Sequence, residues 1–401
     1  MTDTDVQSQA MRRSELPGRY DRGLLLAALG LAALGVVMVA SSSIPVADQE
    51  HIGAMYYLKR HLMFLVAGTL LATIAMRTEL EWVERHSFLL LLVAFVLLLS
   101  VFVPGLGMKI NGARRWIHLG ISGFQPVEAV KLLLICYLAS YLVRHRESVQ
   151  RKLFGVVKPV LVAGFTVALL LAQPDFGSAA LIVATTVGMV WLGGARMRNL
   201  VLLGTPLMPA LAWAAMTEDY RVKRLTSFLD PWADPFNDGF QLTQALIAIG
   251  RGEWFGVGLG GSVQKLFYLP EAHTDFILAV IAEELGLAGI VLVIALFGWL
   301  CGRGLMLGTR AVERGLYFQG YVAYGIALCL ALQAMVSIGV NLGVLPTKGL
   351  TLPLISSGGS SVMMTCAMVG VLLRVSYELS REEARTAAIE RERRETTGVW
   401  A

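Results

Sequence analysis

Three acidic residues lie at the start of one long apolar run of this sequence or within it. Asp275 stands immediately before the run that starts at Phe276, and Glu283 and Glu284 lie within it. Ionisable side chains at membrane depth are costly and usually face a cavity or a partner, which makes each of them a candidate functional residue. A carboxylate at the lipid–water boundary could act as a general base toward a bound substrate.

Each of these acids also has a structural interpretation. Thr274 or Asp275 could cap the helix that follows, because a side-chain oxygen at a helix start accepts hydrogen bonds from free amides. Glu283 and Glu284 lie about two turns further along, where no water-facing surface is expected, so they must be paired, protonated or facing water. A functional or network role and simple helix-packing hydrogen bonds both stay open for them.

Basic residues on the predicted outer side form a second candidate group. Glu128 and Lys131 begin another apolar run and are three residues apart, so they share a helix face and could pair with each other. Alternatively, Lys131 could bind an anionic substrate group such as a pyrophosphate. Four more basic residues add positive charge to the same side, either as snorkelling groups or as phosphate ligands. They are Arg114, Arg115, Lys59 and Arg60.

Two further residue sets carry weaker signals. Asp175 lies in a short QPDFGS connection, where Asp beside Pro and Gly is also a common turn composition. The cysteines have no CxxC spacing and no partner in an outer loop, so neither a disulfide framework nor a zinc site is indicated. They lie within or at the ends of apolar runs, at Cys136, Cys301, Cys329 and Cys366.

A bundle of membrane-spanning helices must position these side chains. The chain has 401 residues, of which 56% are hydrophobic and 16% charged, whereas soluble domains have about 25% charged residues. Its apolar runs are long enough to cross a hydrocarbon core of about 30 Å as helices and too long for barrel strands. We therefore predict an all-α polytopic membrane protein with about ten transmembrane helices. Their approximate ranges are 22–44, 60–76, 87–104, 126–143, 156–173, 177–193, 199–216, 274–300, 315–344 and 357–376.

The distribution of Lys and Arg predicts the orientation of the bundle. Basic residues are concentrated in the terminal and even-numbered loops, which places both termini in the cytoplasm. The predicted parts are a cytoplasmic segment at 1–21, a transmembrane domain at 22–376 and a cytoplasmic tail at 377–401. Acidic and basic residues alternate in the tail, and mixed signs do not build a phosphate-binding patch, so no nucleic-acid partner is predicted.

Two outer segments are expected to hold functional groups. The first is a large loop at 217–273, between the seventh and eighth spans, which we take as the only long extramembrane stretch. It contains an amphipathic segment from about Phe240 that should lie along the membrane surface. The second, at 346–361, is rich in Pro and Gly and joins the last two spans. Irregular backbone near membrane depth must be received by protein or a wet cavity, so this segment should fold back into the bundle.

The sequence resembles the SEDS family (shape, elongation, division and sporulation) over essentially all of its spans. Four segments carry the resemblance, in the family's order: FQPVEAVK at 124–131, QPDFGS at 173–178, the run at 256–286 that contains LPEAHTDF, and PTKGLTLPLISSGGSS at 346–361. LPEAHTDF and TKGLTLP are more similar to the cell-division members than to the elongation members. Ser357 departs from the family pattern, which often has an aromatic residue there.

The resemblance implies a peptidoglycan glycosyltransferase that joins lipid II units during septal wall synthesis at the bacterial inner membrane. It implies that Asp275 is the catalytic residue, and we expect it to act as the general base. A divalent cation, Mg²⁺ or Mn²⁺, could assist at the pyrophosphate. The expected substrate-binding residues are Lys131, Glu128, Arg60, Arg114, Lys348, Ser356 and Ser360, and the expected network residues are Glu283, Glu284 and Asp175.

The resemblance also implies partners, and the residues leave other function classes open. The expected partners are a class B penicillin-binding protein transpeptidase of the division machinery, other division membrane proteins, lipid II and the membrane itself. A lipid II flippase or ion-coupled transporter would also place polar residues and irregular backbone inside a bundle. A scaffold for the division complex is a third class. The absence of an inverted repeat and the position of Asp275 at the outer rim favour an enzyme.

Overall fold

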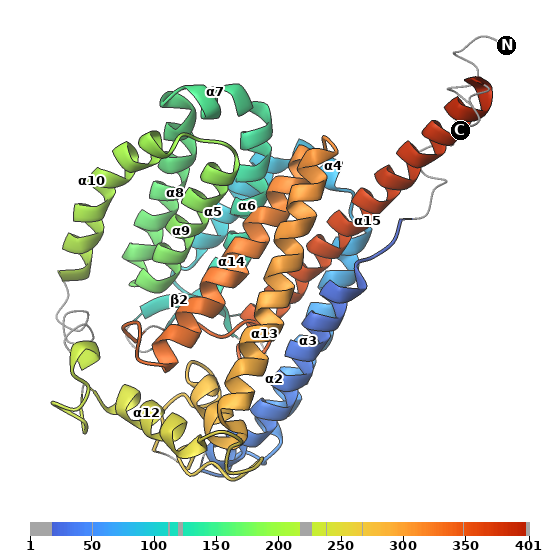
Figure 1. Cartoon of the computed structure of the whole chain (residues 1–401). Helices are drawn as coiled ribbons and strands as arrows, with labels where there is room; N and C mark the ends of the chain where they lie inside the picture. Colours follow the sequence, from blue (N-terminus) through green and yellow to red (C-terminus); the bar gives the residue numbers. More distant parts are fainter. Residues whose placement is uncertain are drawn as a thin grey trace.

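The computed structural model describes residues 18–49, 51–110, 113–118, 123–216, 227–237, 239–266, 268–347 and 349–397. Within these ranges, a helix coincides with each of the ten predicted spans, and together the helices form one bundle (Figure 1). These helices are α2 (Arg22–Gln49), α3 (Tyr56–Arg77), α5 (Ser87–Ser100), α6 (Pro126–Arg144), α8 (Phe154–Ala172), α9 (Phe176–Leu192), α10 (Met197–Met216), α13 (Ile277–Glu313), α14 (Tyr317–Asn341) and α15 (Gly359–Thr397). The predicted all-α polytopic fold is confirmed.

Length and composition make most of these helices able to cross a bilayer. Among the described residues, seven helices are long and apolar enough to do so, and α5 and α9 are shorter apolar helices. Two short helices, α4 (Leu80–Arg85) and α7 (Arg146–Arg151), connect spans at one end of the bundle. The outward faces of α3, α5 and α13 expose large apolar side chains, as helices in contact with lipid do.

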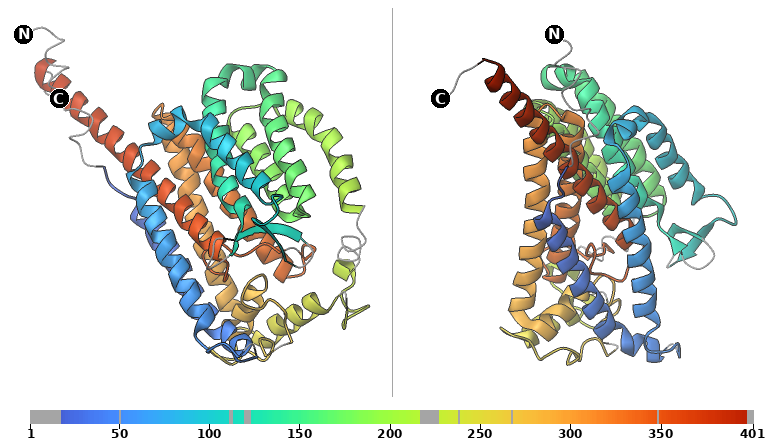
Figure 2. Two further views of the ribbon diagram at one scale, coloured as in Figure 1. Left: turned by 180° about the vertical axis from the view of Figure 1, so that it is seen from behind. Right: turned by 90° about the vertical axis from the view of Figure 1, so that its right-hand side faces the viewer.

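The two described ends of the chain lie side by side. The rings of Tyr20 and Tyr377 are 5.1 Å apart between centroids, and the Arg19 amide donates to Ser380 Oγ at 3.2 Å. Asp21 starts α2, since its carboxylate accepts from the Leu24 amide at 2.8 Å. An even number of crossings explains why both ends share a side. The predicted boundary at 376/377 falls inside α15, which continues as one helix beyond the bundle (Figures 1 and 2).

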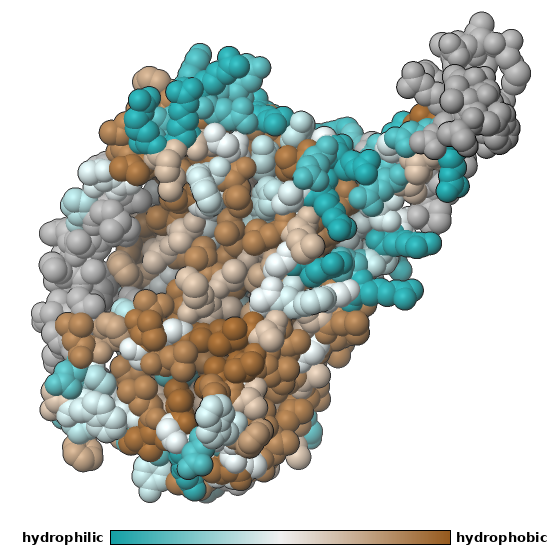
Figure 3. All heavy atoms as spheres, in the orientation of Figure 1, coloured by the Kyte–Doolittle hydropathy of each residue, from teal (hydrophilic) through white to brown (hydrophobic). Residues whose placement is uncertain are grey.

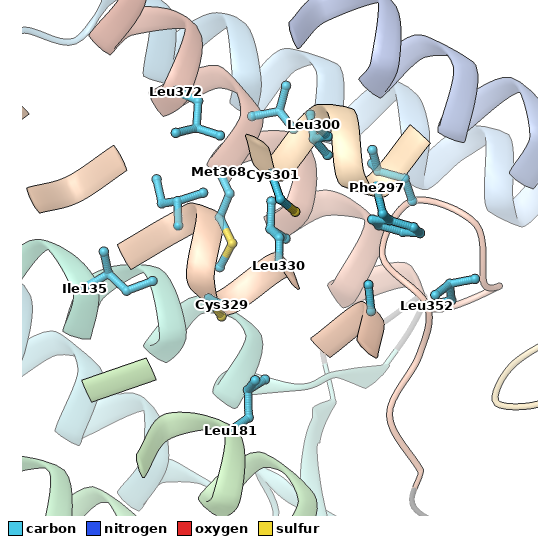
Figure 4. Close-up of a cluster of buried hydrophobic side chains, with 14 of the residues drawn as sticks. Ile135, Leu181, Phe297, Leu300, Cys301, Cys329, Leu330, Leu352, Met368 and Leu372 are labelled. Atoms are coloured by element: carbon cyan, nitrogen blue, oxygen red, sulfur yellow. The ribbon is translucent and has the colours of Figure 1, made fainter. Parts of the chain in front are cut away.

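Side chains from most helices of the bundle form one continuous core, and its central part joins five helices and one loop. Figure 4 shows Phe297, Leu300 and Cys301 of α13 near residues of α6, α9, α14 and α15, together with Leu352 from the α14–α15 connection. Small residues bring α3 and α15 close together: a Cβ atom on Gly68 would lie 2.9 Å from Cys366 Sγ. Such close approach is typical of helix pairs in membranes.

The α5–α6 connection contains a small β-sheet that the sequence analysis did not predict. Its strands β1 (Gly107–Ile110), β2 (Ala113–His118) and β3 (Gly123–Phe124) pair antiparallel in the order β1-β2-β3. The expectation that 217–273 is the only long extramembrane stretch was therefore wrong. Strands of two to six residues are too short to stand out beside long apolar runs. The Asn111-Gly112 pair between β1 and β2 is a hairpin signal that could have revealed them.

The amphipathic helix predicted in the large loop is confirmed as α12 (Phe240–Gly252). It buries Leu242, Ala245 and Ala248 and packs against α13 and α14. α12 lies across the end of the bundle opposite to the described chain ends (Figures 1 and 2). We call this end the outer end, because the orientation rule predicts that it faces out of the cell.

Helix α13 is interrupted at Gly286, whereas the sequence predicted one continuous span at 274–300. Gly286 has φ 67° and ψ −161°, a region that only glycine adopts readily. Residues 253–258 of the outer loop pair with the backbone groups that this break releases. The bonds are Val257 N to Glu283 O (2.9 Å), Gly258 N to Glu284 O (3.1 Å), Leu287 N to Glu253 O (2.9 Å) and Ala288 N to Trp254 O (3.1 Å).

The α14–α15 connection folds back into the bundle, as its composition predicted. Leu352, Leu354 and Ile355 are almost fully buried. They pack near Gly35 of α2, where a Cβ atom would lie 2.5 Å from Leu354 O. This segment therefore lies inside the bundle at its outer end, next to the start of α13.

Candidate active site at the outer end of the bundle

Asp275 lies in a series of turns directly before α13 and is half-buried. The N-cap residue of α13 is Phe276, which makes no side-chain cap bond. Asn341, at the end of α14, supplies the cap instead: its Oδ1 accepts from the Ala279 amide at 3.1 Å, and its Nδ2 donates to Asp275 O at 3.0 Å. The fully buried side-chain amide of Asn341 thus caps α13 and also holds the backbone of Asp275 in place.

The folded-back connection meets Asp275 from the other side. A Cβ atom on Gly349 would lie 3.2 Å from Asp275 Oδ2, so glycine leaves room beside the carboxylate. Ser356 Oγ donates to Thr274 O at 2.6 Å and accepts from the Leu352 amide at 2.9 Å. The Ser357 amide donates to His273 O at 2.9 Å. Residues 273–275 and 349–357 therefore form one hydrogen-bonded unit.

The outer turn of α3 forms a third side of this region. The ring of Tyr57 lies 4.8 Å from the ring of His273. Arg60, three residues further along the same helix, is half-buried, and its guanidinium carbon lies 5.8 Å from the centroid of Phe64. Arg60 is thus a cation on the helix that contacts the segment carrying Asp275.

Glu128 and Lys131 form a buried ion pair in α6. Lys131 Nζ lies 2.8 Å from Glu128 Oε2 and donates to Gln333 Oε1 of α14 at 2.7 Å. Gln333 Nε2 donates in turn to Thr351 O at 3.0 Å. The pair therefore connects, through Gln333, to the same segment that approaches Asp275 at Gly349. Glu128 and Lys131 therefore pair with each other in this structure, as their spacing allowed. Lys131 is buried and shielded from bulk water.

The predicted serine residues belong to the same outer region. Ser360, in the first turn of α15, accepts from the Gln125 amide just before α6 at 2.9 Å. Its neighbour Ser361 accepts from Thr351 Oγ1 at 2.9 Å. Ser356 thus connects the folded-back segment to residue 274, and Ser360 connects its C-terminal end to the start of α6. Lys348 lies outside the described residues.

Arg114 and Asp175 belong to two other elements, the β-sheet and the connection before α9. The start of α9 faces the folded-back segment, since a Cβ atom on Gly177 would lie 3.4 Å from Leu350 Cγ. Arg114 is exposed on β2. Its neighbour Arg115 reaches the QPDFGS connection, where it donates to the carbonyl groups of Gln173 and Pro174 and lies 4.0 Å from Asp175. Asp175 caps α9, since its carboxylate accepts from Ser178 N at 3.2 Å and from Ser178 Oγ at 2.8 Å.

Glu283 and Glu284 anchor the outer loop to the first part of α13. Glu283 accepts from Arg251, Ser262 and the amides of 263 and 264, with its Arg251 contact at 2.8 Å. Glu284 accepts from Lys265 Nζ at 2.6 Å and from Ser41 Oγ of α2 at 2.7 Å. Both carboxylates are fully buried and have cationic partners, which describes a network role.

Several residues of the site were missed by sequence reasoning. Gln333 and Asn341 are uncharged amides inside or at the end of an apolar span, and only their placement among neighbours reveals what they hold. The sequence signal for both is a polar side chain in a membrane helix, which must find a partner. Among the described residues, no group of three or more His, Cys, Asp or Glu side chains could hold a metal ion. We therefore assign no protein ligands for Mg²⁺ or Mn²⁺ among the described side chains.

Comparison with known proteins identifies the family. The model of the FtsW/RodA/SpoVE family, described as a cell cycle protein, matches residues 22–381. The chain belongs to this family. It is 58% identical over 379 residues to the probable peptidoglycan glycosyltransferase FtsW of Xanthomonas oryzae, covering 94% of this chain and 77% of that protein. It is 51% identical over 363 residues to the protein of that name from Thioalkalivibrio sulfidiphilus, covering 90% and 91%.

Solved structures of the family have the same fold. A chain of a peptidoglycan synthase complex, studied for its coordination of polymerization and crosslinking, aligns with a TM-score of 0.70 and 30% identity, covering 89% of this chain and 97% of that one. The rod shape determining protein RodA of Thermus thermophilus aligns with a TM-score of 0.64 and 30% identity, covering 89% and 96%. The predicted SEDS resemblance is confirmed, including its similarity to the cell-division members.

Proposed function

We propose that this protein is a peptidoglycan glycosyltransferase that polymerises lipid II at the outer face of the bacterial inner membrane, at the division septum. The names of its FtsW relatives support the reaction, and the description of the family as a cell cycle protein supports a role in division. The observation that carries the proposal is the setting of Asp275. Its backbone is fixed by the buried Asn341, and its carboxylate faces Gly349 at the outer end of a membrane bundle.

In this mechanism Asp275 removes the proton from the 4-hydroxyl of the acceptor sugar. The hydroxyl oxygen then attacks the anomeric carbon of the donor, the bond to the pyrophosphate breaks, and undecaprenyl pyrophosphate leaves. Attack from the opposite face inverts the linkage from α to β. A half-buried carboxylate suits this role, because it is accessible to a substrate and is held in place by its surroundings.

Negative charge that grows on the leaving pyrophosphate requires cationic groups. Lys131 is one candidate: its ammonium group has three N–H donors, and Glu128 and Gln333 accept from two of them. Arg60 on α3 is a second candidate. A bound divalent cation would supply the same charge stabilisation, with its ligands shared between substrate and water.

A class B penicillin-binding protein is the partner that we propose, together with other division membrane proteins. The support is the similarity of this chain to a chain of a peptidoglycan synthase complex that couples polymerization to crosslinking. Such a transpeptidase would crosslink the glycan strands that this protein releases. The partner would reach the outer end of the bundle, where α12 and the described parts of the large loop lie (Figure 1).

The reaction class is tested with purified protein in detergent micelles. The chain and its class B partner are incubated with lipid II, and glycan strands are separated on a denaturing gel. Micelles do not have two compartments, so polymer identifies an enzyme and excludes a protein that only moves lipid II across a membrane. A folded complex that forms no polymer at any tested divalent-metal concentration would overturn the proposal.

A further inference from the structure

Residues 254–259 of the outer loop expose an unusual amount of apolar surface. Trp254 is 70% exposed, Phe255 is 85% exposed and Leu259 is 62% exposed. Clustered large apolar side chains at the surface usually mark contact with a membrane or a partner. We call this segment the aromatic wedge.

The aromatic wedge is attached to the break in α13. The Leu287 and Ala288 amides donate to the carbonyl groups of Glu253 and Trp254, which places the start of the wedge against the second part of α13. From Leu287 onward the outer face of α13 exposes Val291, Leu292 and other large apolar side chains. The wedge is therefore continuous with an exposed apolar face of a membrane-spanning helix. Figure 3 shows hydrophobic surface that extends from the bundle toward its outer end.

The length of α13 gives the depth of the wedge in the bilayer. At the inner side, Arg303 pairs with Asp21, and Trp299 Nε1 donates to Gly23 O at 3.2 Å. A hydrocarbon core of about 30 Å corresponds to about 20 helical residues at 1.5 Å each. Gly286 lies 17 residues before Arg303, a helical length of about 26 Å, slightly less than the thickness of the hydrocarbon core. The break and the wedge thus lie at the outer lipid–water boundary, where Trp side chains are enriched.

The backbone pairing explains why the break is tolerated there. Unpaired amides and carbonyl groups are expensive next to lipid, so irregular backbone needs protein partners. Residues 253–258 satisfy four such groups on α13. Neither Gly256 nor Gly286 could carry a side chain without a clash, because a Cβ atom on either would lie within 2.5 Å of the opposite backbone.

We propose that the aromatic wedge inserts into the outer leaflet of the bilayer and that lipid acyl chains and headgroups cover Trp254, Phe255 and Leu259. This insertion would hold the first part of α13, which follows Asp275, at a fixed depth. The proposal concerns contact with lipid and does not depend on the reaction assigned above.

The test places a nitroxide spin label on the wedge in the full chain, reconstituted in lipid nanodiscs without a partner. Phe255→Cys is labelled, and Asn237→Cys serves as the control: it is an exposed polar residue of the large loop and has no part in the wedge. The four native cysteines are buried, and the unsubstituted protein gives their background. Accessibility to oxygen and to a water-soluble nickel complex is measured for each label.

We expect the label at 255 to collide more often with oxygen than with the nickel complex, and the label at 237 to show the reverse. Leu259→Cys provides a second wedge position if Phe255→Cys does not fold. A wedge label that is as accessible to nickel as the label at 237 would overturn the proposal. The exposed surface would then be assigned to a protein partner instead of lipid.

Discussion

At the residue scale, three carboxylates of one helix region differ in what they can do. Glu283 and Glu284 are fully buried and bound to Arg251 and Lys265, so a substrate outside the membrane cannot use them as a base. Asp275 is half-buried beside Gly349, and its main chain is held by Asn341. The carboxylates of Glu283 and Glu284 are thus buried in ion pairs, whereas the carboxylate of Asp275 is partly accessible.

Substitutions in the buried pair of Glu128 and Lys131 can separate its contribution to stability from its contribution to polymerisation. Lys131→Met should lower the free energy of unfolding by about 3–5 kcal/mol, because it leaves Glu128 buried without a counter-charge. Adding Glu128→Leu removes both charges and should restore most of that stability. Thermal unfolding in detergent measures both effects.

Lipid II polymerisation by the double variant then reports on Lys131 as a substrate ligand. If Lys131 stabilises the leaving pyrophosphate, the double variant is folded but polymerises lipid II at least about 100-fold more slowly. Polymerisation at the wild-type rate would show that the pair has only a structural role.

At the element scale, the sequence predicted the elements that have long or distinctive sequence patterns. The ten apolar runs, α12 and the folded-back segment at 346–361 were all recognisable from hydropathy, helical spacing and Pro–Gly content. The β-sheet was missed because its strands are short. The break in α13 was missed because a single glycine in an apolar helical pattern is usually tolerated. Its cause is a loop about 30 residues earlier in the chain, which no local pattern shows.

The same distinction applies to the site. The sequence marked Asp275 and both members of the Glu128–Lys131 pair as candidates, because ionisable residues stand out in apolar surroundings. It did not locate Gln333 or Asn341, whose importance lies in contacts to other elements. It also could not show that Arg115 contacts the QPDFGS connection while Arg114 is exposed.

Glycine substitutions in α13 test the break directly. Gly286→Ala should lower the free energy of unfolding by about 1–3 kcal/mol, because its backbone conformation is available almost only to glycine. Gly298→Ala is the matched control in the same helix, since a Cβ atom there meets nothing within 4 Å; it should be neutral or stabilising by up to about 1 kcal/mol. Thermal unfolding of both variants in detergent gives the comparison. Equal stabilities would mean that α13 does not require the break.

At the scale of the whole molecule, the two ends of the bundle differ in the residues that they bring together. The end that carries the described chain ends is held by ion pairs such as Asp21–Arg303 and Arg374–Glu378. The outer end brings together the start of α13, the outer turn of α3 and the folded-back connection around Asp275. The bundle therefore presents a half-buried carboxylate at the surface from which a lipid-linked sugar would approach.

The most direct test of this account is the polymerisation of lipid II by Asp275→Asn in complex with the class B partner. Asp234→Asn is the control, because it makes the same chemical change at another acidic residue of the outer region. Loss of a general base should slow polymerisation by about 10²–10⁴-fold, while Asp234→Asn should keep the wild-type rate and both variants should unfold at the wild-type temperature. Polymerisation by Asp275→Asn at the wild-type rate would contradict the assignment of Asp275 as the base.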